Sequence, residues 1–228
     1  MFSKFQRFDK LFGKGASELL SQKNILIFGL GGVGSICCEA LIRSGVGRLT
    51  LVDFDTIDIT NLNRQIQTNS KNIGCYKTDE LIKRLEDINP NAKLVGLKEF
   101  FSSESKIIFN EFDYVIDAID SVQSKVEIIK RAKENGVRVI SAMGAGNKID
   151  PTKFEVTYIE KTHTDPLAKV MRKKLKDLGI KQVKCVFSSE YPKEVSNELT
   201  NAPGSCSFVP PVMGLVIASE VIKDLLEV

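Results

Sequence analysis

Several features that mark common classes of protein are missing from this sequence. It has a single histidine, His163, and none of its five cysteines belongs to a Cys-x-x-Cys pair. Zinc sites are built mainly from histidine and cysteine, so we expect no zinc here. An odd number of cysteines without such pairs is typical of reduced thiols, which predicts a cytoplasmic location.

Long apolar runs and a strong net charge are absent as well. The longest apolar stretch, 209–226, is interrupted by Gly214 and by charged residues such as Glu220. It therefore predicts a buried C-terminal helix rather than a membrane span, and we expect no membrane partner. The first 22 residues lack the apolar core of a signal peptide. The net charge of +3 permits contact with nucleic acid but does not indicate it.

Apolar runs alternate with amphipathic segments along most of the chain. This alternation predicts an α/β fold, a doubly wound, Rossmann-like, mostly parallel sheet, followed by a C-terminal extension of mixed strands and helices. A length of 228 residues suits one complete core and is short for two. Strands are expected at 24–28, 48–52, 93–97, 114–117, 137–142, 154–159 and 183–188, and helices at 33–44, 76–88, 121–135, 165–178 and 209–226. Residues 1–22 predict an N-terminal helical arm, and the Pro-, Asn-, Ser- and Gly-rich segment 190–207 predicts a mobile loop.

A glycine-rich turn follows the first expected strand and opens a helix. Such a turn brings backbone N–H groups and the helix dipole onto a phosphate. Asp53 ends the next strand, where a carboxylate reaches a ribose hydroxyl, and Asp55 is a second candidate for that contact. The turn and these two acids predict a nucleotide site. The glycines expected to line it are Gly29, Gly31, Gly32 and Gly34.

Two cations downstream of Asp53 indicate which nucleotide is bound. Arg64 lies in the loop segment Asn61-Leu62-Asn63-Arg64-Gln65, and Lys77 opens a helix, where the dipole disfavours a cation. The uncharged nicotinamide half of a dinucleotide would offer these residues little, whereas a triphosphate would use both. The pattern therefore predicts ATP, with Asn61 and Asn63 also near the phosphates unless they serve only as turn formers.

Asp120 and Ser121 stand where the fourth strand meets the next helix. A carboxylate facing a triphosphate is where Mg²⁺ is normally held. The alternative is that Asp120 only caps the helix. Ser121 completes the expected set of nucleotide ligands.

Two further features allow more than one interpretation. Cys185 lies in a strand pattern and is either a buried structural thiol or a nucleophile, and no role can be assigned to Cys206. Helix 165–178 has a basic face, which is either a solvated surface or a nucleic-acid patch. Its cations are Lys169, Arg172, Lys173, Lys174 and Lys176, extended by Lys161, Lys181 and Lys184.

The glycine turn, Asp53, the segment 61–65, Lys77 and the segment 117–120 together resemble the adenylating domain of the ubiquitin-activating-enzyme-like superfamily. Within it, a closer resemblance to the tRNA threonylcarbamoyladenosine dehydratases extends over nearly the whole chain. That resemblance rests on further segments, among them Arg7-Phe8, Gly144-Ala145-Gly146, Asp165-Pro166-Leu167-Ala168 and Cys185-Val186-Phe187-Ser188.

The resemblance implies that residues 1–228 form a single adenylating (ThiF-type) domain. The implied activity is ATP-dependent cyclisation of threonylcarbamoyladenosine beside the tRNA anticodon, through an acyl-adenylate and with release of pyrophosphate and AMP. Arg64, Lys77 and Asp120 would be catalytic, with Asp120 holding Mg²⁺. Arg7 would reach the ATP of the partner subunit in a homodimer. The implied partners are tRNA and a sulfur-transfer protein.

Three alternatives remain open at this stage. The chain could activate the C-terminus of a ubiquitin-like sulfur carrier, or bind tRNA under nucleotide control without catalysis. It could also be an NAD-dependent oxidoreductase, although none of its four tyrosines begins a Tyr-x-x-x-Lys pattern.

Overall fold

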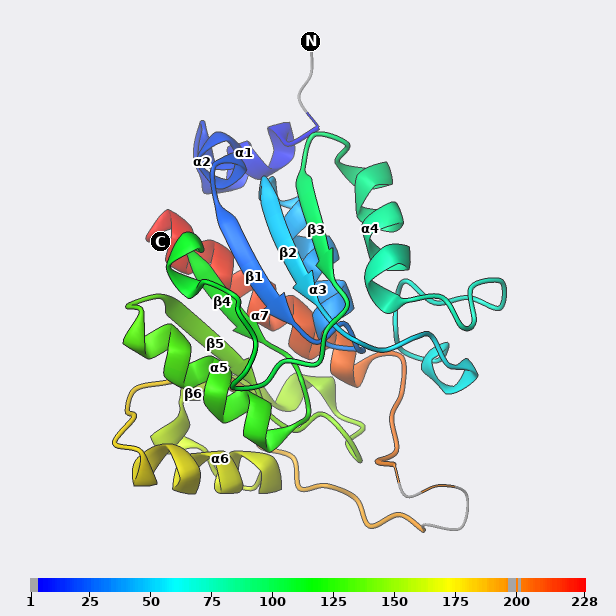
Figure 1. The fold of residues 1–228 in the computed structure, drawn as a ribbon, viewed down its shortest axis with the longest axis vertical. Coiled ribbons are helices and arrows are strands. Elements are labelled where there is room, and N and C mark those ends of the chain that lie inside the picture. Colours follow the sequence, from blue (N-terminus) through cyan, green and yellow to red (C-terminus); the bar gives the residue numbers. More distant parts are fainter. Residues whose placement is uncertain (1–3, 197–199, 201) are drawn as a thin grey trace.

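A single sheet organises the chain in the computed structural model, which describes residues 4–196, 200 and 202–228 (Figure 1). Within these residues the strand order is β3-β2-β1-β4-β5-β7-β6. All neighbouring strands pair in parallel except β6 and β7, which are antiparallel. The strands are β1 (Asn24–Phe28), β2 (Arg48–Val52), β3 (Lys93–Leu97), β4 (Tyr114–Asp117), β5 (Arg138–Ala142), β6 (Phe154–Tyr158) and β7 (Lys184–Ser188). The predicted α/β class and mostly parallel sheet are confirmed.

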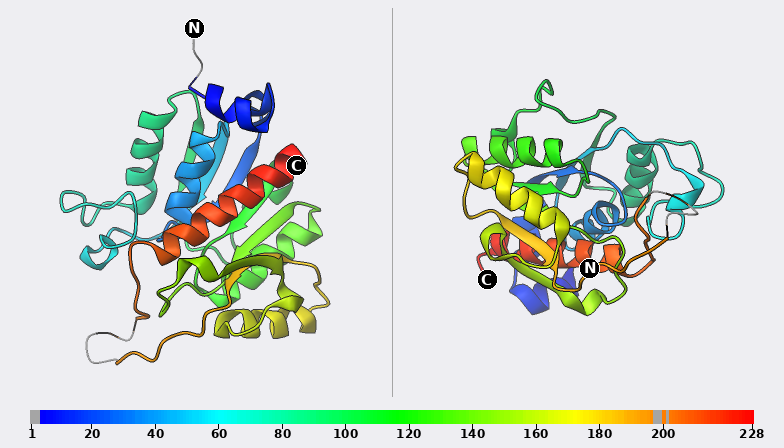
Figure 2. Two further views of the ribbon diagram at one scale, coloured as in Figure 1. Left: turned by 180° about the vertical axis from the view of Figure 1, so that it is seen from behind. Right: turned by 90° about the horizontal axis from the view of Figure 1, so that it is seen from below.

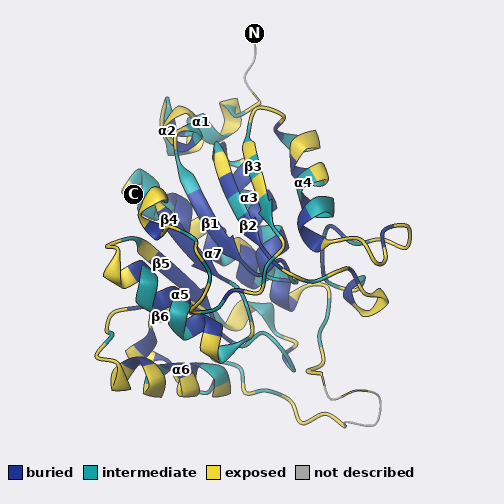
Figure 3. Cartoon of the chain, viewed as in Figure 1, coloured by how far each residue is buried: buried dark blue, intermediate teal, exposed yellow. Residues whose placement is uncertain are grey.

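Helices cover both faces of the sheet (Figure 2). On one face pack α3 (Gly34–Arg43), α4 (Lys77–Ile88) and α7 (Val209–Leu226), and on the other α5 (Val122–Glu134) and α6 (Pro166–Asp177). Each face has its own apolar core, and most of the sheet between them is buried (Figure 3). Short 3₁₀ turns connect these elements: η1 (Ile59–Asn61), η2 (Phe109–Glu111), η3 (Pro151–Lys153) and η4 (Ile159–Lys161).

The C-terminal helix α7 is buried in this core, as its sequence predicts. Gly214 allows it to pack closely against α3, because a Cβ atom at this position would lie 2.2 Å from the carbonyl oxygen of Val33. Among the described residues, no helix is both long and apolar enough to cross a membrane.

The N-terminal arm is helical but not continuous. It consists of α1 (Gln6–Phe12) and α2 (Ala16–Ser21), separated by Gly13 and Gly15, whose φ angles are +107° and +89°. Phe8 and Phe12 stack with ring centroids 4.5 Å apart and pack against the core. The arm lies at the amino ends of the strands, opposite the glycine turn (Figure 1).

The segment 190–207 contains no helix or strand in its described residues, and residues 197–199 and 201 lie outside them. Both of its described ends form hydrogen bonds with the loop that follows β5. The carboxylate of Glu190 accepts hydrogen bonds from the N–H groups of Ile149 and Asp150. The N–H of Gly204 donates to the Oδ1 of Asn147 at 2.6 Å. The mobility predicted for this loop stays a prediction.

Candidate nucleotide site

The carboxyl ends of β1, β2, β3 and β4 surround a pocket of about 340 Å³. Most of the residues expected from the sequence to bind nucleotide line this pocket. They are Gly29, Gly31, Gly32, Asp53, Asp55, Asn61, Arg64, Lys77, Asp120 and Ser121. Gly34, Asn63 and Arg7 are not part of the lining.

The glycines of the turn serve two different purposes. A Cβ at Gly34 would lie 1.8 Å from the carbonyl oxygen of Gly29, and one at Gly29 would lie 2.7 Å from that of Ala118. Both glycines therefore allow close backbone packing, and Gly29 also lines the pocket. At Gly31 the nearest atom to such a Cβ is the Nε2 of Gln65 at 3.9 Å, so this position is open to a ligand that approaches the backbone.

Asp53 joins the glycine turn to the end of β2. Its Oδ2 accepts the N–H of Leu30 at 2.6 Å, and its Oδ1 accepts the N–H of Asp55 at 2.8 Å. Burial raises the pKa of the Asp53 carboxyl, and the charge of Lys77 opposes that shift. Each carboxylate oxygen can accept a second hydrogen bond, so these contacts leave room for a ribose hydroxyl.

Lys77 is buried at the start of α4, and its Nζ lies 2.6 Å from the Oδ2 of Asp55. This ion pair explains how a cation is accommodated at a helix N-terminus. Asp55, expected near the ribose, instead contacts the cation expected at the phosphates.

Arg64 is held by its neighbours in the loop that follows β2. Its Nη1 donates to the carbonyl oxygen of Thr60 at 2.8 Å and to the Oδ1 of Asn63 at 2.9 Å. The Nδ2 of Asn63 donates to the carbonyl oxygen of Ser205, the residue before Cys206. Asn63 thus links Arg64 to the end of segment 190–207. Asn61 lines the pocket, while its Oδ1 closes the η1 turn by accepting the N–H of Asp58 at 3.0 Å.

Asp120 does not cap α5. The N-cap is Ser121, whose side chain accepts the N–H of Ser124 at 3.4 Å. The alternative interpretation of Asp120 as a helix cap is therefore wrong, and its exposed carboxylate lines the pocket. The described residues contain no cluster of three or more His, Cys, Asp or Glu that could hold a metal ion. A single carboxylate nevertheless fits Mg²⁺, which takes most of its ligands from phosphates and water in nucleotide sites.

A buried ion pair behind Asp120 was not predicted from the sequence. Lys125 and Asp117 are both fully buried, with Nζ 3.0 Å from Oδ2. The same ammonium donates to the carbonyl oxygen of Ile119 at 2.9 Å, and the Oγ of Ser141 donates to Asp117. These bonds fix the loop that carries Asp120. One feature of the sequence could have indicated it. Lys125 lies on the buried face of α5, which also includes Ser124 and Ile128.

Cys185 is a buried structural thiol in β7. Burial raises its pKa to about 12, and the nearby carboxylates of Asp165 and Glu160 add to the shift. A thiol that remains protonated at neutral pH is a poor nucleophile.

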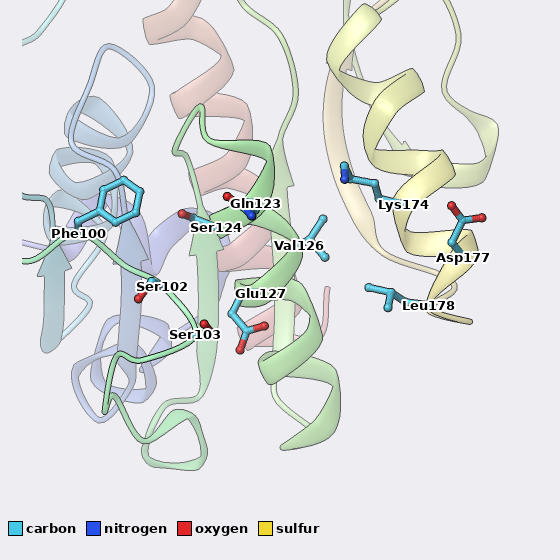
Figure 4. Close-up of a pocket in the computed structure, with 10 residues that line it drawn as sticks. All are labelled: Phe100, Ser102, Ser103, Gln123, Ser124, Val126, Glu127, Lys174, Asp177 and Leu178. Atoms are coloured by element: carbon cyan, nitrogen blue, oxygen red, sulfur yellow. The ribbon is translucent and has the colours of Figure 1, made fainter.

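A second cavity of about 540 Å³ opens beside the nucleotide pocket. The two cavities share Phe100 and Ser124. Figure 4 shows its walls, formed by the loop after β3, by α5, and by the end of α6 with Lys174 and Asp177.

The basic face of α6 is smaller than the sequence implied. Arg172 donates to the carbonyl oxygen of Thr162 at 2.6 Å, and Lys184 pairs with Asp224 of α7 at 2.7 Å. The other cations of this face are exposed: Lys161, Lys169, Lys173, Lys174, Lys176 and Lys181.

A family model described as the ThiF family matches residues 5–228. The chain belongs to the ThiF family. It is 42% identical to the tRNA threonylcarbamoyladenosine dehydratase of Bacillus subtilis, over 100% of this chain and 96% of that protein. It is 34% identical to the dehydratase of Escherichia coli, over 95% and 91% of the two chains.

The fold agrees with these relatives. The crystal structure of the E. coli dehydratase in complex with ATP matches with a TM-score of 0.89 at 34% identity, covering 98% of this chain and 94% of that chain. These matches confirm the resemblance to the dehydratases, which the motifs of the sequence indicated.

Proposed function

We propose that this protein uses ATP to cyclise threonylcarbamoyladenosine in tRNA, releasing pyrophosphate and AMP. The observation that carries the proposal is the pocket itself. Four charged residues line the pocket together with the glycine turn: two acids, Asp53 and Asp120, and two cations, Arg64 and Lys77. Dehydratases related over the full length, one of them solved with ATP, support the same activity.

The first step joins the substrate to AMP. The threonyl carboxylate attacks the α-phosphorus of ATP, the bond to the bridging oxygen breaks, and pyrophosphate leaves. Arg64 and Lys77 stabilise the negative charge that grows on the phosphate oxygens, from positions fixed before the reaction begins. Asp120 would hold Mg²⁺, which supplies further charge neutralisation to the phosphates when it is bound.

The second step closes the ring. The carbamoyl group of the substrate attacks the activated carbonyl carbon and releases one N–H proton to solvent, and AMP leaves with one oxygen of the former carboxylate. The two groups belong to the same molecule, so proximity is already supplied. A protein nucleophile is unnecessary, which agrees with the burial and raised pKa of Cys185.

The substrate and the assembly follow from the same proposal. The exposed lysines of α6 would contact tRNA phosphates, and the reaction would take place in the cytoplasm. In a homodimer Arg7 would complete the ATP site of the partner subunit. Arg7 is exposed on α1, at the opposite end of the sheet from the pocket of its own chain.

The decisive test is incubation with ATP, magnesium and tRNA that carries threonylcarbamoyladenosine, followed by mass analysis of the nucleosides. We expect the modified nucleoside to lose the mass of one water molecule, with AMP formed in equal amount. Unmodified tRNA is the matched control and should give neither product. AMP release that requires a carrier protein instead of tRNA would favour the sulfur-carrier alternative, and quenching of nicotinamide fluorescence would favour the oxidoreductase.

A further inference from the structure

The wall of the nucleotide pocket contains a buried acceptor without a donor. Four buried side-chain oxygens lack a hydrogen-bond partner among the described residues: Gln65 Oε1, Gln67 Oε1, Thr78 Oγ1 and Glu99 Oε1. Of these residues, Gln65 and Glu99 line the pocket, and Glu99 is the one with a carboxyl group. Leaving such a group without a donor is costly, and a ligand that supplies one would remove the cost.

Glu99 lies in the loop after β3, next to the strand that Asp53 follows, and both residues line the pocket. Glu99 follows β3 by two residues, and β3 pairs with β2, where the N–H of Asp53 donates to the carbonyl oxygen of Leu97 at 3.1 Å. The preceding side chain points elsewhere, because the Nζ of Lys98 lies 2.8 Å from Asp79 and 4.5 Å from the ring centre of Tyr76.

The lining of the pocket combines charged and apolar side chains. Arg64 and Lys77 are its cations, and Phe28, Phe100, Phe101, Ala118 and Ile119 are apolar. Phosphates bind with the cations, so the apolar side chains are left for the nucleoside. Glu99 directly precedes two of them, Phe100 and Phe101. A carboxylate repels phosphate but accepts a hydrogen bond from a nucleoside hydroxyl or amine.

We propose that Glu99 is a nucleoside-recognition residue, which accepts a hydrogen bond from a ribose hydroxyl or from the exocyclic amine of ATP. This inference rests on the proposed function, since it takes ATP as the nucleotide. A hydrogen bond to a charged group corresponds to about 10- to 100-fold in affinity. Glu99 is thereby a determinant of which nucleotide this chain accepts.

Calorimetric titration of the whole protein tests the assignment. Four nucleotides are compared: ATP, 2′-deoxy-ATP, 3′-deoxy-ATP and purine riboside triphosphate, which lacks the amine. One of the three analogues lacks the group that donates a hydrogen bond to Glu99. The wild type should bind that analogue about 10- to 100-fold more weakly than ATP. In Glu99→Ala, ATP should bind as weakly as that analogue, and the affinity of the analogue should fall no further. Which of the three analogues binds more weakly shows whether Glu99 accepts a hydrogen bond from a ribose hydroxyl or from the amine.

Two further variants separate recognition from structure. Glu99→Gln keeps an acceptor oxygen and should restore part of the ATP affinity. Glu104→Ala removes an exposed acid from the same loop, outside the pocket lining, and should bind ATP like the wild type. Without nucleotide, Glu99→Ala should melt no lower than the wild type, because a buried oxygen without a donor has been removed.

Failure of the Glu99 assignment can be distinguished from failure of the proposed function. If the wild type binds ATP and Glu99→Ala shows the same relative affinities for all four nucleotides as the wild type, the assignment of Glu99 is overturned. If the wild type binds none of the four, the proposed function fails, and the assignment fails with it.

Discussion

The ammonium of Lys77 lies 2.6 Å from the carboxylate of Asp55, so the cation expected at the phosphates already has an anionic partner in its own chain. The side chain of Lys77 is 7% exposed and that of Asp55 is 43% exposed. Asp55 therefore holds the lysine at the pocket while remaining free to turn toward solvent. A bound triphosphate would compete with Asp55 for the same cation.

Lys77→Met should lower ATP-dependent AMP formation by about two orders of magnitude, the scale for losing one preorganised charge. Methionine keeps the buried stem packed, so the fold should survive. Arg64→Ala should reduce the rate to a similar extent. Asp55→Asn is the matched control, because it removes the partner but leaves the cation, and its effect on the rate should be much smaller. Near wild-type turnover in Lys77→Met would contradict the phosphate assignment.

Asp120 and Ser121 separate metal binding from helix capping. Asp120→Asn should leave the melting temperature nearly unchanged, because Ser121 is the cap, yet it should raise the magnesium concentration needed for half-maximal activity. Ser121→Ala should leave the magnesium dependence unchanged. It should lower the free energy of unfolding by about 1 kcal/mol, because the helix cap is lost. Equal magnesium dependence in Asp120→Asn and the wild type would remove the metal role from Asp120.

Cys185 should resist alkylation at the pH values where ordinary thiols react. Because its pKa is about 12, little thiolate forms as the pH rises from neutral to mildly alkaline, so its reaction with iodoacetamide should stay slow. Exposed Cys75 is the internal control and should react readily. Cys185→Ser should retain substantial cyclisation. An inactive but folded variant, with a trapped thioester in the wild type, would instead indicate covalent catalysis.

The sequence predicted the fold because its signals are local and repeated. Buried strands such as β1 and β4 are continuous apolar runs, and caps such as Asp165 with Pro166 define helix starts within a few residues. The nucleotide pocket was predictable for a related reason, since the carboxyl ends of parallel strands meet at one edge. The helical arm was predicted as well, but its break at Gly13 and Gly15 was not.

What the sequence did not predict depends on pairs that are distant along the chain or that face inward unexpectedly. The ion pair of Lys125 with Asp117, both fully buried, was not predicted. Lys184 looked like part of the basic face, but it pairs with Asp224, forty residues away. Charged side chains are hard to place because their partner, rather than their own hydropathy, decides whether they are buried.

The exposed lysines of α6 are predicted to contact tRNA. Lys173→Glu combined with Lys174→Glu should weaken tRNA binding and flatten its dependence on salt, by about one unit of slope for each phosphate that the helix no longer neutralises. The matched control reverses the charge of Arg48 and of Lys93. These two residues are exposed and lie opposite each other at the amino ends of β2 and β3. An equal effect of both double variants would mean that net charge, rather than this helix, controls binding.

Arg7 is predicted to act across a two-fold dimer. It is exposed on α1, at the amino ends of the strands, whereas the pocket lies at their carboxyl ends. A contact with phosphate would thus come from another copy of the chain. Arg7→Ala and Arg64→Ala should each be inactive as homodimers, because each lacks one arginine at both shared sites.

Mixing the two inactive variants should restore activity if the sites are shared. In a hybrid dimer, one site receives both intact arginines and the other receives neither. Random exchange makes about half of the dimers hybrids, so roughly a quarter of the wild-type activity should return. Each variant mixed with itself is the control and should stay inactive. Complete subunit exchange without recovery would mean that Arg7 acts within its own subunit or has no part in the reaction.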